Sequence, residues 1–428
     1  MMRIAEGIDV AILAEDHWKW LKEKIEFDKT DLELQNLDSE KRDVSIQKNL
    51  ALRKLLAPHF KDLEKIIKGD LDYLKTLNTD PFFSKFFFKP DKEVKEKELE
   101  LDDATHQWQD QLKVVKELRE KRKKDPKDPT IKASLKKEDG IRDLLNKKKE
   151  KIREEYNAKI KQERAKYLEF KRNTNIKVQI QNENEIEEKE FDLIDLLCYD
   201  KLNSGDKNWN ANILREKLNV AVCPYCNRQY ILGAKNIDGG WVTSAQLDHF
   251  LPKNFNPLLS CSFFNLIPSC YCCNHIKSDF DGEPLYPYKE GFNNDAKFYV
   301  DFEDGIDIKD LNLEDDVMVD IDTKSARPPQ KDKIEMSIVI FRLRELYKMH
   351  QHEIKNLLHR IKSTRELRDR EFADLYFGRG YDDLNPSEKK ELTNFLLGLP
   401  ILLSDEDFPL KKLKKDIIEQ FFPGGCLK

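Results

Sequence analysis

Four cysteines form two pairs with the same spacing, close together in the middle of the chain. Cys223 and Cys226 enclose Pro-Tyr, and Cys270 and Cys273 enclose Tyr-Cys. Two thiolates three positions apart can bind one tetrahedral zinc ion at about 2.3 Å. The two pairs therefore predict a structural Zn²⁺ site, with Cys272 as an alternative ligand in the second pair.

The segment between the two pairs is longer than a compact zinc ribbon uses, so it must contain a structural element of its own. It holds the dipeptide Asp248-His249, within Leu-Asp-His-Phe-Leu-Pro-Lys over 247–253, and then Asn265, in Asn-Leu-Ile-Pro-Ser-Cys. Asn274 directly follows the last cysteine of the second pair. One aspartate, one histidine and two asparagines thus lie inside the predicted zinc frame or at its edge.

This order of residues inside a paired-cysteine frame resembles the HNH endonucleases. The resemblance covers about residues 205–300, and the segment Tyr286-Pro-Tyr-Lys-Glu-Gly-Phe292 is also similar to bacterial proteins of this group. It implies a small α+β core of the ββα-metal type. In that core the thiolate zinc is structural and staples a unit that is too small to fold on its own apolar residues.

The resemblance also implies roles, and the chemistry explains them. Phosphodiester cleavage needs a nucleophilic water, neutralisation of developing charge and a stabilised leaving oxygen. Asp248 and Asn274 are expected to hold one divalent ion, Mg²⁺ or Mn²⁺, through oxygen atoms. His249, on the opposite side of the strand from Asp248, is the expected general base for water. Asn265 is expected to pin the loop so that His249 faces the scissile phosphate.

Several assignments at this site have alternatives. Lys253 and Lys277 are expected to contact substrate phosphates. The family often has histidine where this chain has Asn274, so the neighbouring His275 is an alternative second ligand of the catalytic ion. Asp279 is a further candidate for the same site.

Composition and charge favour long solvated helices around a smaller core. The chain is 37% charged and 39% hydrophobic, with a net charge of −5. Residues 111–172 hold 23 Lys/Arg against 12 Asp/Glu, whereas residues 301–324 hold 10 acidic and 2 basic residues. Such asymmetry can steer a polyanion to one part of the protein. With no signal segment and no apolar run of membrane length, a cytoplasmic protein without membrane contact is expected.

The pattern divides the chain into three regions and predicts a mainly α fold with helical arms flanking the nuclease core. Residues 1–190 are expected to form a charged helical arm that binds a partner or nucleic acid. Within it, Pro58 marks a helix break or a new helix start. Residues 92–172 are expected to form an antiparallel helical hairpin or an irregular coiled coil, interrupted at 125–129 and at Gly140. Residues 191–300 form the HNH domain. Residues 301–428 form an acidic segment, with a strand at 317–321, and a helical domain with a helix start at Asn385.

The expected function is a metal-dependent HNH endonuclease that cuts DNA. The chain resembles nuclease subunits of bacterial antiphage defence systems, including Septu-like systems, which implies an ABC-type ATPase or another defence subunit as partner. An RNase using the same site is an alternative, as is a non-catalytic zinc-stapled binding or scaffold module. Candidate partner contacts are the aromatic segment 82–88 and the tail 421–426.

Overall fold

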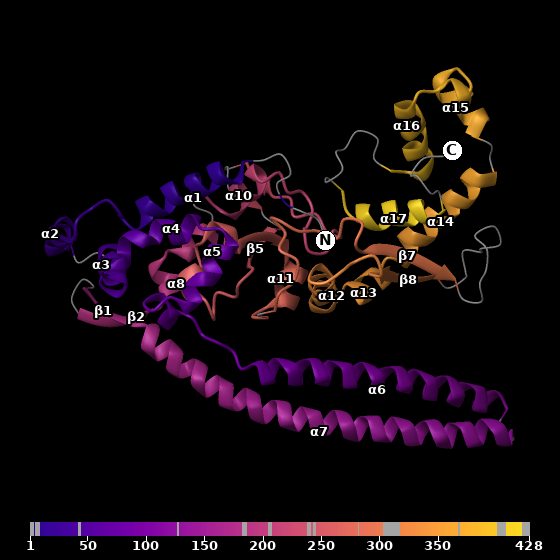
Figure 1. The fold of residues 1–428 in the computed structure, drawn as a ribbon, viewed down its shortest axis with the longest axis horizontal. Helices are drawn as coiled ribbons and strands as arrows, with labels where there is room; N and C mark the ends of the chain where they lie inside the picture. Colours follow the sequence, from indigo (N-terminus) through magenta and orange to yellow (C-terminus); the bar gives the residue numbers. More distant parts are fainter. Residues whose placement is uncertain are drawn as a thin grey trace. The chain divides into compact units, whose positions relative to one another are not determined.

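The structure is a computed structural model of the 428-residue chain. It describes residue 4 and residues 9–41, 44–125, 128–181, 186–203, 208–237, 241–242, 245–280, 282–302, 317–366, 369–399 and 408–421. Helices dominate this part of the chain, and its strands pair into four two-stranded sheets, as Figure 1 shows. The prediction of a mainly α-helical protein with only small sheets is therefore confirmed.

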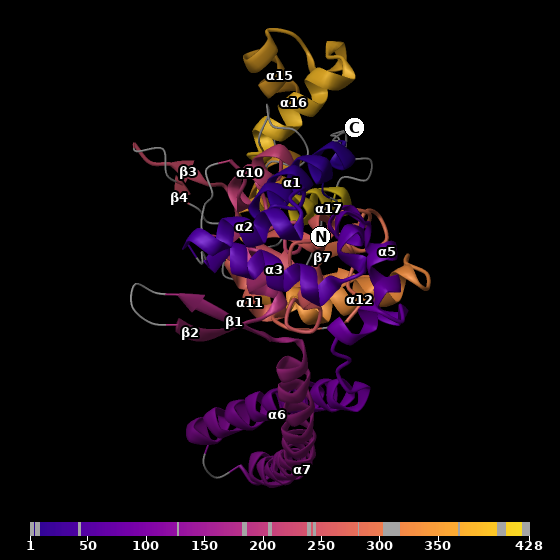
Figure 2. The same cartoon turned by 90° about the vertical axis from the view of Figure 1, so that its left-hand side faces the viewer.

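One compact unit is a long helical hairpin within Asp80–Lys177. Its two helices, α6 (Lys92–Lys124) and α7 (Pro129–Thr174), run side by side in both Figure 1 and Figure 2. The charged side chains of the two helices meet in pairs, such as Arg119 with Asp139, and the Lys149 ammonium lies 3.8 Å from the Trp108 ring centroid. The predicted hairpin is confirmed, but the predicted interruption at Gly140 is wrong, because α7 runs through it without a break.

The aromatic segment that precedes this hairpin includes the short 3₁₀ helix η3 (Phe83–Phe86). Phe83, Phe86 and Phe87 are buried, and Phe88 contacts the rings of Tyr167 and Phe170 near the end of α7. The segment therefore serves largely as packing. Of the tail 421–426, only residue 421 lies within the described residues.

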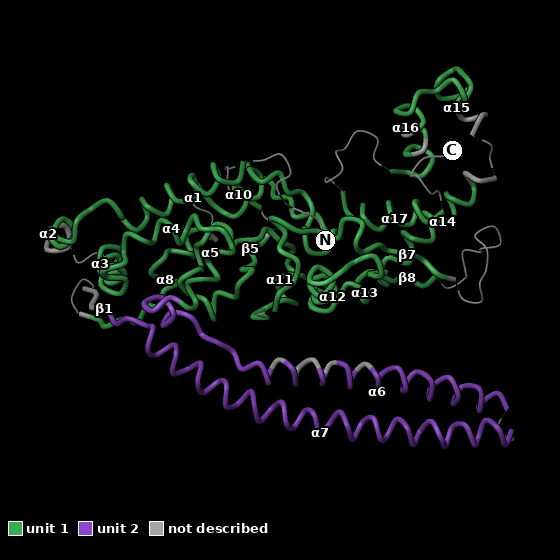
Figure 3. Tube along the Cα trace, in the orientation of Figure 1, with its two compact units in different colours: residues 1–79, 178–428 green, residues 80–177 purple. Residues whose placement is uncertain are grey.

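The other compact unit comprises Met1–Thr79 and Val178–Lys428, coloured green in Figure 3. The expected N-terminal region 1–190 thus contributes to both units. The first part of the larger unit is helical, and Pro58 stands between two helices as predicted. Its elements are α1 (Val10–Lys24), α2 (Asp31–Lys41), α3 (Val44–Leu56), η1 (His59–Asp62), α4 (Leu63–Lys68), α5 (Leu71–Thr76) and η2 (Leu77–Thr79).

The middle of the chain contains the strands and short helices that carry the candidate site. Strand β5 (Ala245–His249) pairs antiparallel with β6 (Leu266–Cys270), and α11 (Tyr271–Lys277) begins at the residue after β6. Before β5 come β1 (Ile176–Gln181), β2 (Ile186–Phe191), α8 (Leu193–Leu196), α9 (Tyr199–Asn203), α10 (Ala211–Lys217), β3 (Ala234–Lys235) and β4 (Trp241–Val242). The site elements are β5 (Ala245–His249), η4 (Pro257–Leu259), η5 (Phe263–Asn265), β6 (Leu266–Cys270) and α11 (Tyr271–Lys277).

The last part of the larger unit confirms two local predictions. Strand β8 (Val317–Asp322) alternates between buried and more exposed side chains, and it pairs antiparallel with β7 (Lys297–Phe302). Asn385 caps α16 (Pro386–Leu397) in a capping box with Glu388. The other elements are α12 (Gln330–Ile340), α13 (Leu343–Lys348), α14 (Gln351–Glu366), α15 (Asp369–Phe377), η7 (Tyr381–Asp383) and α17 (Lys411–Phe421). Within the described ranges, every helix is too short or too polar to cross a membrane.

Candidate functional site

The four predicted cysteine ligands come together in one buried cluster. The Sγ atoms of Cys223, Cys226, Cys270 and Cys273 all lie within 4.8 Å of one another. The Sγ atoms of Cys226 and Cys270 are 3.9 Å apart, close to the edge of about 3.8 Å in a tetrahedron of thiolates around zinc. Cys272 is half-buried and lies outside this cluster. The cluster could therefore bind a structural metal such as zinc.

The burial of these four sulfur atoms bears on how they could hold a cation. Burial is the main reason that the pKa of Cys223 is raised, with hydrogen bonds to Cys226 and Cys270 acting in the same direction. The Cys273 backbone N–H also donates to Cys270 Sγ at 3.4 Å, as the first turn of α11 folds over its N-cap. A cation would replace the thiol protons and compensate the buried negative charge that four thiolates would otherwise bring together.

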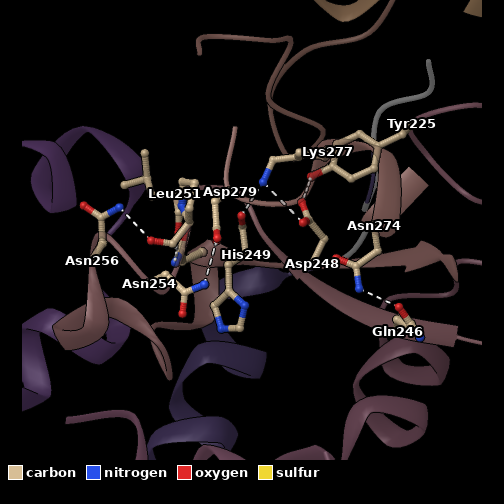
Figure 4. Close-up of polar contacts among 12 residues, drawn as sticks. Tyr225, Gln246, Asp248, His249, Leu251, Asn254, Asn256, Asn274, Lys277 and Asp279 are labelled. Carbon is tan, nitrogen blue, oxygen red and sulfur yellow. Dashed lines mark hydrogen bonds and ion pairs between the residues drawn. The ribbon is translucent and has the colours of Figure 1, made fainter. Parts of the chain in front are cut away.

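Next to the cluster, β5, β6 and α11 form a strand–strand–helix unit. In the β5–β6 register, Asp248 lies opposite Ile267 and His249 opposite Leu266. Because side chains alternate along a strand, Gln246 and Asp248 share one face of β5 and His249 lies on the other. The close-up in Figure 4 shows Asp248 and Gln246 directed toward residues of α11, with the His249 ring on the other side of the strand.

The Asp248 carboxylate is buried, and each of its oxygens has a partner. The Tyr225 hydroxyl donates to Oδ2 at 2.7 Å, and the Lys277 ammonium lies 3.2 Å from Oδ1. Tyr225 lies inside the first cysteine pair and stacks on Phe341, with 4.3 Å between ring centroids. The cysteine cluster thus holds the side chain that orients Asp248.

The His249 ring is fixed by a backbone carbonyl. Its Nε2 lies 2.9 Å from the Ser260 oxygen, and its ring packs 4.7 Å from that of Tyr199. A carbonyl oxygen can only accept, so Nε2 carries the hydrogen and the neutral ring has its lone pair on Nδ1. Burial of the ring is the main reason that the pKa of His249 is lowered to about 3, so the ring is neutral at physiological pH.

Asn265 holds the loop between β5 and β6 in shape. Its Oδ1 accepts from the Leu251 N–H at 2.7 Å, and its Nδ2 donates to the carbonyls of Leu251 and Leu259, both at 3.1 Å. Leu259 directly precedes Ser260, whose carbonyl holds His249. Asn265 therefore fixes both ends of the loop that orients the histidine ring.

The side chains of α11 and the segment after it complete the site. Asn274 donates through Nδ2 to Gln246 Oε1 at 2.5 Å, which leaves Oδ1 as its atom for a cation. His275 is exposed and stacks parallel to Tyr271. The carboxylate of Asp279 accepts from Asn254 Nδ2 at both of its oxygens, at 3.0 and 2.8 Å.

These groups line a single open pocket of about 280 Å³. The lining includes most of the residues singled out from the sequence, namely Asp248, His249, Lys253, Asn274, His275 and Asp279. The Lys253 ammonium lies over the Tyr199 ring, 4.4 Å from its centroid. The Lys277 side chain, expected to contact phosphate, is instead 1% exposed, does not line the pocket and donates to the His249 carbonyl oxygen at 2.6 Å.

Tyr225 and Gln246 are site residues that the sequence analysis missed. Gln246 stands two positions before Asp248, so strand alternation alone would have placed it on the same face. No comparable local signal marks Tyr225, whose hydroxyl reaches Asp248 only after the first cysteine pair has packed against β5.

Comparison of the chain with protein-family models, with curated proteins and with solved structures gave no match.

Proposed function

We propose that the chain is a metal-dependent endonuclease of the HNH type that hydrolyses phosphodiester bonds, with DNA as the preferred substrate. The observation that carries the proposal is the convergence of Asp248, His249 and Asn274 on one pocket of a strand–strand–helix unit beside the cysteine cluster. A general base, a carboxylate and an amide oxygen in one open pocket are the groups that metal-assisted hydrolysis needs.

In this proposal His249 accepts the proton of the attacking water at Nδ1. The Ser260 carbonyl keeps the other ring hydrogen on Nε2, so that the neutral ring carries its lone pair on Nδ1. Asn265 acts indirectly, because its three hydrogen bonds fix the loop that carries the Ser260 carbonyl.

Asp248 and Asn274 Oδ1 would hold the divalent ion, and these hard oxygen donors suit Mg²⁺ or Mn²⁺. When bound, that ion neutralises charge on the phosphate and stabilises the leaving oxygen. Lys253 at the pocket rim is the proposed phosphate contact. An ABC-type ATPase or another defence subunit as partner, and the basic hairpin as a nucleic-acid arm, remain predictions.

Cleavage assays test the proposal directly. Zinc-loaded protein is incubated with supercoiled plasmid DNA and, separately, with total RNA, in the presence of Mg²⁺ or Mn²⁺. Cutting of DNA is expected, and His249→Ala should slow it by a factor of about 10² to 10⁴, the usual contribution of a general base. Preferential cutting of RNA would keep the chemistry and change the substrate.

The controls separate catalysis from folding. The exposed His352 lies outside the pocket, so His352→Ala should cut like the wild type. His275→Ala tests the alternative ligand, and a loss as large as that of Asn274→Ala would reassign the ion. A zinc-loaded, folded protein that cuts neither polymer with either cation would favour the non-catalytic module instead.

A further inference from the structure

A buried ion pair joins Asp248, which lines the candidate catalytic pocket, to Lys277, which does not line it. The Lys277 ammonium lies 3.2 Å from Asp248 Oδ1 and donates to the His249 carbonyl oxygen at 2.6 Å, and both side chains are at most 3% exposed. Figure 4 shows the ammonium between these two oxygens. A lysine so placed neutralises the carboxylate and does not face solvent.

The two partners of Asp248 differ in charge and in their place in the fold. Tyr225 is fully buried between two cysteines and is stacked on Phe341, so its hydroxyl has a fixed position. Lys277 is the last residue of α11, and the exposed Ser278 follows it. Its ammonium is carried on a flexible four-carbon stem. Oδ2 thus accepts from a neutral hydroxyl, whereas Oδ1 is paired with a cation, the kind of partner that competes with a metal ion.

A divalent ion at Asp248 would have to share or take over Oδ1 from this ammonium. Two cations at one buried carboxylate repel each other strongly in a medium of low polarity. We propose, resting on the nuclease function above, that Lys277 is a resident counter-ion of Asp248 that weakens divalent-ion binding until a nucleic-acid phosphate offers the ammonium another anion.

This exchange keeps every charge paired. In the free protein the ammonium pairs with Asp248. In the loaded protein the divalent ion pairs with Asp248 and the ammonium with a substrate phosphate. The ion and the nucleic acid therefore bind cooperatively, and each strengthens the binding of the other by the same factor. A site of this kind stays largely empty of its ion in the absence of substrate.

The test measures Mn²⁺ affinity and not cleavage. Zinc-loaded His249→Ala protein, which should leave DNA intact, is titrated with Mn²⁺, and free Mn²⁺ is read by electron paramagnetic resonance. The titration is repeated with a short duplex DNA and in the added variants Lys277→Gln, Lys277→Arg and Asp248→Asn. Zinc content and thermal unfolding confirm that each variant is folded.

Without DNA, the Lys277→Gln protein should bind Mn²⁺ at least about tenfold more tightly than its parent, because the competing cation is gone. Lys277→Arg keeps a cation and should stay weak. DNA should tighten Mn²⁺ binding to the parent by at least about tenfold and have little effect on Lys277→Gln. Equal Mn²⁺ affinity in Lys277→Gln and the parent, with Asp248→Asn weakened, would overturn the proposal and leave the nuclease assignment standing.

Two further results complete the test. Mn²⁺ binding that is unchanged by Asp248→Asn would remove the ion from this carboxylate and so count against the proposed function as well. Should Lys277→Gln not fold, lysine acetylation of wild-type protein read by mass spectrometry serves instead. Saturating Mn²⁺ should speed labelling of Lys277 by at least about threefold as the ammonium is displaced, and unchanged labelling would overturn the proposal.

Discussion

At the scale of single residues, the orientation of His249 depends on a second buried histidine far away in sequence. His17 on α1 lies 2.8 Å through Nε2 from the carbonyl oxygen of Cys261, the residue after Ser260. Trp209 donates its indole N–H to the other ring nitrogen of His17 at 2.8 Å. Both ring nitrogens of the neutral His17 thus have a hydrogen-bond partner. Through this histidine, the loop that holds His249 is bound to helix α1.

The protonation of His17 predicts a pH-dependent stability. Burial lowers the pKa of His17 to about 4, whereas in the unfolded chain it lies near 6.5. The unfolded chain therefore binds a proton that the folded one does not, and stability is lost as pH falls from 6.5 toward 4. The loss from this residue should reach about 2 kcal/mol by pH 5.

Urea unfolding of the wild type and His17→Gln at pH 7.5 and pH 5 checks this. The variant should be less stable at pH 7.5, because the amide replaces the ring imperfectly between Trp209 and Cys261. Its further loss on going to pH 5 should be smaller than that of the wild type by about 2 kcal/mol. His249 has the same sign of shift and is present in both proteins, so it cancels in the comparison. An identical pH dependence of stability in the wild type and in His17→Gln would show that His17 does not cause the loss at low pH.

At the scale of secondary-structure elements, the sequence predicted correctly those features that depend on a few neighbouring residues. The helix start at Asn385, the alternation from Val317 to Ile321 and the paired cysteines all depend on a few neighbouring residues, and each was found in the structure. Gly140 was predicted to break a helix, but an isolated glycine costs a helix only about 1 kcal/mol. The packing of α7 along α6 outweighs this cost.

The same reasoning predicts that Gly140→Ala stabilises the hairpin. A Cβ at this position would meet nothing within 4 Å outside the helix backbone. The gain should be about 1 kcal/mol, seen as roughly fivefold slower hydrogen exchange of nearby α7 amides. Ala158→Gly, at an exposed position of the same helix, should give a loss of similar size. Faster exchange in Gly140→Ala would mean that the glycine serves a bend or close contact.

The contacts of Asp248 and Lys277 lay beyond what the sequence could predict. Lysine after a cysteine knuckle indicated a phosphate contact, and nothing in its neighbours in sequence distinguishes that from the buried pair with Asp248. The choice depends on how α11 packs against β5, which brings Lys277 Nζ to Asp248 Oδ1 across 29 positions of sequence. Likewise, Tyr225 meets Asp248 through tertiary packing alone.

At the scale of the whole molecule, the first cysteine pair ties the candidate site to the C-terminal helices. The Tyr347 hydroxyl of α13 donates to the Cys226 carbonyl oxygen at 2.6 Å. Asn227 accepts through its backbone oxygen from the Leu410 N–H at 2.6 Å and through Oδ1 from the Lys412 N–H at 3.1 Å. These hydrogen bonds connect α13 and the start of α17 to the segment Cys223–Asn227. The packing of these helices in the larger compact unit therefore depends on the conformation of that segment.

Loss of the metal should therefore destabilise the larger unit and not only the pocket. Cys226→Ser should lower zinc content from one ion per chain to well below one and abolish cooperative unfolding of this unit. Structural zinc contributes about 10–16 kcal/mol in small zinc domains, as much as the whole stability of most proteins. Mass-spectrometric zinc analysis and calorimetry measure both effects.

Cys272→Ser is the matched control, since Cys272 neighbours the cluster without belonging to it. It should keep its zinc and its unfolding temperature. A Cys226→Ser protein that retains a full equivalent of zinc would show that the cluster binds the ion by another set of ligands.

The position of Tyr225 between two thiolates also links the pocket to the redox state of the cell. An oxidant that attacks Cys223 or Cys226 would expel a metal ion bound by the cluster and free the segment that holds the tyrosine hydroxyl on Asp248. No pocket group is itself modified, yet the carboxylate loses its hydroxyl partner. Peroxide treatment should then abolish the activity of the site without modifying its residues, and reduction of the thiols together with added zinc should restore that activity.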